Sequence, residues 1–167
     1  MRGIGLICGL SVCLTSFAAP LPPRPVADGV RARTNWQPAA AMKRGTRTFV
    51  FRDGQQLARA MNLTGTSAGD TATAMLAQRL RVPALDWDKH MVVTVSAGLR
   101  GEEADRLTVT RVAVEADRMT VYYKLSVSGP GPASGFGYPA ETVLLDRFSG
   151  TVRFEEEKAA PAPKKAD

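Results

Sequence analysis

The sequence is poor in the residue types that build thiol and metal chemistry. Its two cysteines, Cys8 and Cys13, lie near the start of the chain, and His90 is the only histidine. A structural zinc site takes about four nitrogen or sulfur ligands, which one imidazole cannot supply. Because both cysteines fall in a segment that we expect to be removed, we expect no disulfide, no catalytic thiol, no metal and no cofactor in the remaining chain.

Long apolar runs are also scarce, and the one at the start of the chain has the form of a secretory signal. A positive charge precedes an apolar run over residues 4–14, and small residues around Ala18 follow it. This run is shorter than the roughly 20 residues that span a bilayer. We therefore expect residues 1–18 to be a signal peptide, no membrane span, and a secreted, periplasmic or cell-envelope location. Val12 precedes Cys13 where a lipobox has a small residue, so we do not expect a lipid anchor at Cys13.

The net charge of +6 is not spread evenly along the chain. Residues 46–156 carry 13 basic and 13 acidic side chains, whereas residues 19–45 carry five basic and one acidic. A nucleic-acid groove needs its lysines and arginines on the domain that forms the groove. We therefore expect no nucleic-acid binding.

Composition divides the chain that follows the leader into three parts. Residues 19–45 hold five of the 11 prolines and no periodic apolar face, which predicts an extended linker. Residues 157–167 have no apolar side chain larger than alanine or proline, which predicts a disordered tail. We expect a single domain over residues 46–156.

Hydrophobic periodicity within this domain changes from helical to alternating. Residues 47–51 indicate a first strand, Asp53 is placed to cap a short helix, and Asp70 is placed to cap a second. From Lys89 onward, apolar residues recur at every second position. We therefore expect an α+β fold, with a predominantly antiparallel sheet of sandwich-like or half-barrel form and two short helices near the start of the domain.

The later strands carry more detailed signals. The alternation shifts phase across Thr110 and Arg111, which predicts a β-bulge. Residues 115–118 fit a hairpin turn. Further strands are expected over residues 119–127, 141–146 and 151–155.

The single histidine is the simplest candidate for a catalytic residue in this chain. His90 has Asp86 and Asp88 close by in the sequence. A Ser-His-Asp triad converges only in space, so spacing cannot identify it. We expect His90 to be a structural or surface residue, and a small hydrolase that combines His90, one of these acids and a loop serine remains an alternative.

The stretch over residues 128–139 is rich in glycine and proline and cannot form a ladder strand. It displays two aromatic residues, Phe136 and Tyr138, which supply much apolar area at low entropic cost. We therefore take Phe136, Tyr138 and Pro139, with Arg100 from another loop, as candidate partner contacts. In the alternative, both rings fold back and cover the open end of the sheet.

One family resemblance is carried by two segments. Residues 85–98 read Leu-Asp-Trp-Asp-Lys-His and then a valine-rich strand ending in glycine, and residues 138–145 read Tyr-Pro-Ala-Glu-Thr-Val-Leu-Leu. Together they make residues 85–145 resemble the PrcB C-terminal domain, which is named after a subunit of a bacterial surface protease complex. Family members usually have a Thr-Gly-Gly-Tyr-like turn after the glycine, whereas residues 101–106 here read Gly-Glu-Glu-Ala-Asp-Arg.

The resemblance implies a non-catalytic envelope module that associates with another protein, and it does not imply protease activity. We therefore expect an exported protein-interaction module that is not an enzyme, an accessory subunit of an envelope protease complex. The alternatives are a secreted protease inhibitor that offers the 128–139 loop and a small hydrolase that uses His90.

Overall fold

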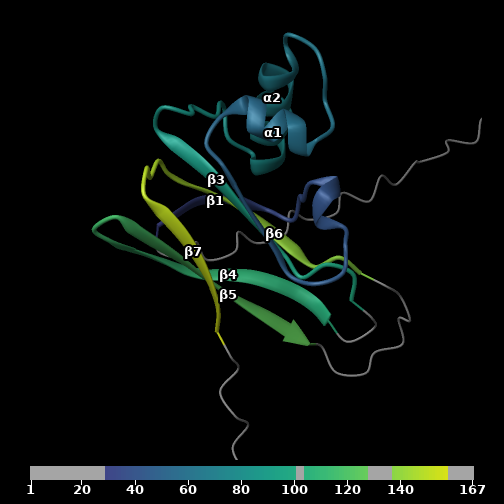
Figure 1. The fold of residues 1–167 in the computed structure, drawn as a ribbon, viewed down its shortest axis with the longest axis vertical. Coiled ribbons are helices and arrows are strands. Elements are labelled where there is room, and N and C mark those ends of the chain that lie inside the picture. The colour runs from purple at the N-terminus through teal and green to yellow at the C-terminus, as the bar shows by residue number, and fades with distance from the viewer. Residues whose placement is uncertain (1–28, 101–103, 128–136, 158–167) are drawn as a thin grey trace, which may run out of the picture.

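The computed structural model describes residues 29–100, 104–127 and 137–157 (Figure 1). The expected signal peptide and Phe136 lie outside these residues. The elements in chain order are β1 (Val30–Thr34), the 3-10 helix η1 (Ala39–Ala41), β2 (Arg47–Phe51), α1 (Gly54–Ala60), α2 (Ala68–Leu80), β3 (His90–Ser96), β4 (Ala104–Glu115), β5 (Arg118–Val127), β6 (Ala140–Asp146) and β7 (Thr151–Glu156). The predicted α+β class, with two short α-helices early in the domain, is confirmed.

The strands form two sheets. The first has the order β1-β6-β3-β2 with every neighbour antiparallel, and the second has the order β4-β5-β7. The predominantly antiparallel pairing was predicted, but β5 and β7 pair in parallel. The reason is that the short connection from Asp146 to Thr151 carries the chain from the first sheet to the second instead of forming a hairpin.

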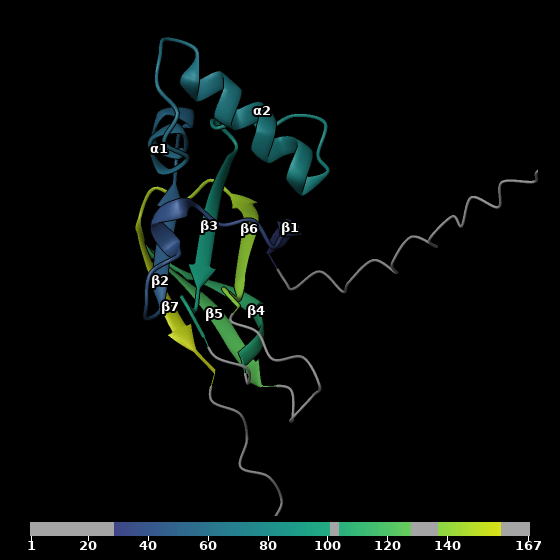
Figure 2. The same ribbon diagram turned by 90° about the vertical axis from the view of Figure 1, so that its right-hand side faces the viewer.

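The first sheet is buried on both faces. Met91, Val93 and Val95 of β3 pack against the inner face of the second sheet. On the opposite face, Val92 and Leu144 pack against both helices. Figures 1 and 2 show these helices gathered at one end of the molecule. Burying one aliphatic side chain completely stabilises the fold by roughly 1.5–3 kcal/mol. Because β3 has apolar side chains on both faces, each face must be covered, one by the second sheet and the other by the helices.

The start of α1 was predicted correctly and the start of α2 was not. The Asp53 side chain caps α1 by accepting from the Gln56 backbone N–H at 2.7 Å. In α2, the N-cap is Ser67, whose carbonyl accepts the Thr71 N–H, and Asp70 lies within the first turn. There the carboxylate is stabilised by the positive end of the helix dipole.

The bulge and the hairpin in the second sheet are confirmed. The register of β4 against β5 shifts between Val109 and Arg111. At the hairpin, Glu115 pairs with Arg118, and Ala116 adopts a φ of 48°. The chain therefore reverses over two residues, as the local sequence indicated.

The linker predicted over residues 19–45 is wrong for its described part. Residues 30–34 form β1 along the edge of β6, and Ala41 is fully buried. Polar residues on the buried face of the first sheet hold this segment, since Thr142 Oγ1 donates to the Trp36 carbonyl at 2.7 Å. Such hydroxyls need partners when they are buried, and the proline-interrupted chain provides them.

The described chain also extends one residue into the predicted tail. The backbone N–H of Glu157 donates to the Tyr123 carbonyl at 2.7 Å, so pairing with β5 continues to this point. Its carboxylate lies 3.1 Å from Arg111, whose guanidinium covers the Tyr122 ring at 3.4 Å.

Including residues 29–45 adds four basic side chains to the folded part. Two of them are paired with carboxylates of β6: Arg31 with Asp146, and Arg33 with Glu141. The folded domain is therefore more basic than the neutral balance expected for residues 46–156. Within the described residues, neither helix has the length and apolarity needed to cross a bilayer.

Candidate functional site

The end of the first sheet farthest from the helices brings together three of the four candidate partner contacts. Strand β3 ends at Ser96 and β6 begins at Ala140, and these two residues pair with each other. Arg100 follows the first strand end, while Tyr138 and Pro139 precede the second. We call the surface formed by Gln37, Met42, Arg100, Tyr138 and Pro139 the loop-end surface.

Backbone hydrogen bonds fix the two loops to each other. Arg100 and Gly137 form an antiparallel bridge, with N···O distances of 3.0 and 3.2 Å. The Ala97 N–H donates to the Pro139 carbonyl at 2.9 Å. Arg100 Nε donates back to the Ala97 carbonyl at 3.1 Å, so this side chain positions its own loop. The backbone on both sides of Tyr138 is therefore held in place.

Gln37 also holds these two loops in place through its side chain. The sequence did not indicate this role, because Gln37 lay in the predicted linker. Its Nε2 donates to the Tyr138 carbonyl at 3.1 Å, and its Oε1 accepts from Ser96 Oγ at 2.8 Å. Ser96 is fully buried. A polar residue on the buried face of an apolar strand was the available signal, because its hydroxyl needs a partner.

Gly98 allows a third segment to approach this end of the sheet. A Cβ at this position would lie 2.2 Å from the Lys43 carbonyl oxygen, and the φ of +70° favours glycine. The Leu99 N–H donates to that same carbonyl at 3.3 Å. The segment that carries Met42 is thereby held against the end of β3.

Two side chains of this surface are exposed although they are largely apolar. Tyr138 is 39% exposed and Met42 is 50% exposed. Neither belongs to either core cluster of the described residues. An exposed aromatic ring on a fixed backbone can dock into a complementary apolar pocket.

His90 lies at the opposite end of β3, beside the helices. Its backbone N–H donates to the Asp86 carbonyl at 2.8 Å, and it pairs across the sheet with Asp146. Its Nδ1 is buried, and no described residue provides a hydrogen bond to it. No described residues form a cluster of three potential metal ligands.

Two of the carboxylates near His90, those of Asp86 and Asp146, have lowered pKa values. A hydrogen bond from Lys89 is the main cause that lowers the pKa of Asp86, with a backbone hydrogen bond from Asp88 adding to it. A hydrogen bond from Arg31 is the main cause that lowers the pKa of Asp146. Both acids therefore have partners of their own on the surface, and Asp86 also forms the turn that leads into β3.

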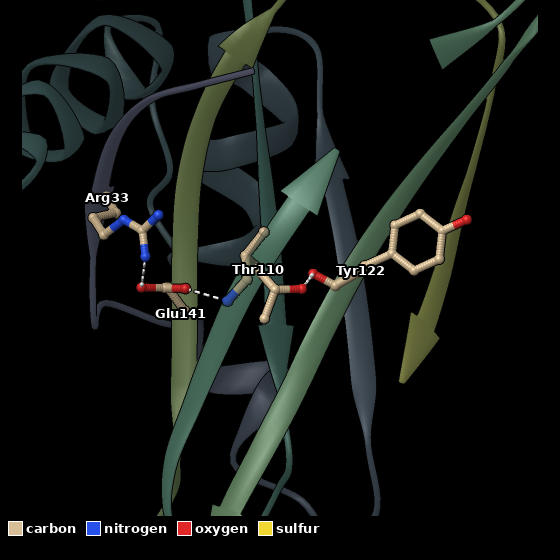
Figure 3. A network of polar contacts seen from close by, with 5 residues as sticks. Arg33, Thr110, Tyr122 and Glu141 are labelled. Carbon is tan, nitrogen blue, oxygen red and sulfur yellow. Dashed lines mark hydrogen bonds and ion pairs between the residues drawn. The ribbon is translucent and has the colours of Figure 1, made fainter. Parts of the chain in front are cut away.

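A buried ion pair lies between the two sheets (Figure 3). Arg33 Nη1 is 3.3 Å from Glu141 Oε1, and the side chains are 14% and 4% exposed. The other oxygen of Glu141 accepts the backbone N–H of Val109 in β4. This acid was read from the sequence only as the start of a strand, and its partner lay in the predicted linker.

Comparison with protein families, with curated proteins and with solved structures gives no match to this chain. The resemblance to the PrcB C-terminal domain therefore stays a hypothesis, carried by residues 85–98 and 138–145.

Proposed function

We propose that this chain is an exported, non-catalytic module that binds another protein through the loop-end surface. The observation that carries the proposal is that Tyr138 is 39% exposed although its backbone is held in place. Gln37 donates to its carbonyl, and its neighbours Gly137 and Pro139 are hydrogen-bonded to Arg100 and Ala97. Aromatic side chains are enriched among the residues that dominate protein interfaces.

The fixed backbone favours binding by lowering its entropic cost. Ordering a loop on association reduces affinity, and a loop that is already hydrogen-bonded loses less freedom. Met42 extends the apolar area on the neighbouring segment, and its flexible thioether adapts to partners of different shape. The surface thus combines a rigid anchor with an adaptable neighbour.

The class of partner and the location are proposed from the sequence. The signal-like leader supports export, and the resemblance over residues 85–145 supports association with an envelope protease complex. A nucleic-acid partner is disfavoured because Arg31 and Arg33, two of the four added basic residues, are paired within the fold.

A site-specific photo-crosslink tests the proposal. A photoreactive phenylalanine analogue replaces Tyr138 in one variant and Val114 in the other, since Val114 is 58% exposed but lies on β4 beside the hairpin. We expect a saturable adduct with one envelope protein from position 138 and none from position 114. Equal labelling from both positions, or none from position 138, would contradict the proposal.

The same adduct separates the alternatives. If the partner is a protease whose turnover falls on binding, the module is an inhibitor. A hydrolase that uses His90 would instead lose its activity in His90→Ala while its crosslink from position 138 persisted.

A further inference from the structure

A pocket on the helix side forms a second surface, remote from the loop-end surface. It has a volume of about 690 Å³ and lies between α1, α2 and the segment over residues 82–87 that leads into β3. We call it the helix pocket. Ala77, Pro83 and Leu85 give it an apolar wall, while Asp53 and Asp70 carry its charges. None of the described residues that line it is a lysine or an arginine.

Trp87 lines the same pocket in a fixed orientation. Its Nε1 donates to Thr73 Oγ1 at 3.0 Å, and that hydroxyl donates to the Gly69 carbonyl at 2.7 Å. An indole face attracts both proline rings and cations. The helix pocket therefore fits a ligand with an apolar, extended body and one positive charge.

The chain contains a segment with this chemistry just before its described part. Residues 20–26 read Pro-Leu-Pro-Pro-Arg-Pro-Val, and Arg24 is the only charged residue between Ala19 and Ala27. Proline-rich segments favour an extended polyproline II conformation that loses little entropy when it docks into an aromatic-lined groove. Its single cation complements the two carboxylates of the pocket.

The strand register places the pocket within reach of this segment. Val30 and Met91 pair with Leu145 from opposite sides of β6, so they are about 10 Å apart, two strand spacings. Trp87 precedes Met91 by four residues. Arg24 precedes Val30 by six, which span roughly 19 Å in polyproline II. Strand β1 also lies next to α2 (Figure 2).

We propose that residues 20–26 of this chain occupy the helix pocket, with Arg24 against Asp53 and Asp70 and the prolines against Trp87. Because the segment is tethered, its effective concentration at the pocket is in the millimolar range. A basic, proline-rich peptide from another protein would have to displace it.

The test compares nuclear magnetic resonance spectra of the purified protein and of two arginine variants. Arg24→Ala removes the proposed cation, and Arg44→Ala removes an exposed one from the loop before β2. We expect Arg24→Ala to displace the Trp87 indole N–H resonance and the amide resonances of Ala74 and Ala77, and Arg44→Ala to leave them in place. Asp70→Asn should cause the same indole displacement, with no further change when it is combined with Arg24→Ala.

An unchanged indole resonance in Arg24→Ala would overturn the proposal. A synthetic peptide of residues 19–28, added to Arg24→Ala, should restore the original position of that resonance. If the peptide binds to the pocket although Arg24→Ala caused no displacement, the pocket takes such ligands only from other proteins, and the assignment to this chain's own segment is wrong.

Discussion

Arg33 in the edge strand β1 donates to Glu141 in the internal strand β6, with 3.3 Å between Nη1 and Oε1. The same carboxylate accepts the Val109 N–H of the second sheet. One buried acid therefore holds the edge strand, the internal strand and the opposite sheet together. Arg33 Nε and Nη2 are buried, and no described residue accepts from them, so the pair is the main compensation for burying this guanidinium.

Removing the acid should destabilise the fold strongly. Glu141→Ala leaves the Arg33 guanidinium and the Val109 N–H buried without this acceptor, and breaking a buried pair in this way costs about 3–5 kcal/mol. Glu141→Gln keeps an acceptor oxygen, so its loss should be smaller. Urea unfolding of both variants measures the difference. Equal stability of wild type and Glu141→Ala would show that the pair does not support the fold.

Acid should weaken the contact between β1 and the end of β6. The pKa of Asp146 lies below its ordinary value of 3.8, chiefly because Arg31 donates to its carboxylate. A carboxyl group that is more acidic in the folded than in the unfolded state stabilises the fold above the unfolded pKa, and this contribution is lost as the pH falls through the folded pKa. We expect the melting temperature to fall below about pH 4, and to fall less in Asp146→Asn.

The pair is exposed, so the effect of Asp146 alone should be modest. The pKa values of Asp86 and Glu157 are lowered as well, by hydrogen bonds led by those from Lys89 and Thr110, and they act in the same direction. A steeper acid loss in Asp146→Asn than in the wild type would contradict the assignment.

Gly98 should tolerate no side chain. Gly98→Ala adds a Cβ that meets the Lys43 carbonyl and keeps an unfavourable positive φ, for a combined cost of at least about 2 kcal/mol. Gly137→Ala is the matched control in the bridged loop, since its Cβ would have no atom within 4 Å. Thermal unfolding should separate the two variants, and similar melting temperatures would disprove the close approach.

The buried hydroxyls that hold the N-terminal segment can be tested in the same way. Thr142 Oγ1 lies 2.6 Å from Thr94 Oγ1 and donates to the Trp36 carbonyl. Thr142→Val leaves that carbonyl without this donor and should cost about 1–3 kcal/mol. Thr48→Val, at an exposed position near the start of β2, should be nearly neutral. Hydrogen exchange should show β1 opening first in Thr142→Val, and unchanged protection there would contradict the role of this contact.

Local sequence patterns predicted the faces of the strands and the position of the bulge, because these features depend on residues close together in the sequence. The alternation in β3 identified its two faces, and the phase shift at Thr110 identified the bulge, since each depends on neighbouring residues. The parallel pairing of β7 could not be found this way. It depends on where the chain goes after Asp146, which no local pattern determines.

The site was predicted in part for the same reason. Tyr138 was identified as a displayed aromatic from the glycine and proline around it. Gln37 and Arg33 were missed because prolines and charges indicate a linker when the sheet that binds them is not known. Their partners, Ser96 and Glu141, were visible as polar residues in apolar strands, and buried polar groups require partners.

The most direct test of the central claim measures stability and partner affinity together in Tyr138→Ala. The free energy of unfolding should change by less than about 0.5 kcal/mol, as for an exposed position. Affinity for the protein crosslinked at position 138 should fall about 5- to 150-fold, which corresponds to an anchor of about 1–3 kcal/mol. Tyr138→Phe, which keeps the ring, should bind nearly as well as the wild type. A marked loss of stability with unchanged affinity would contradict the account and make Tyr138 part of the fold.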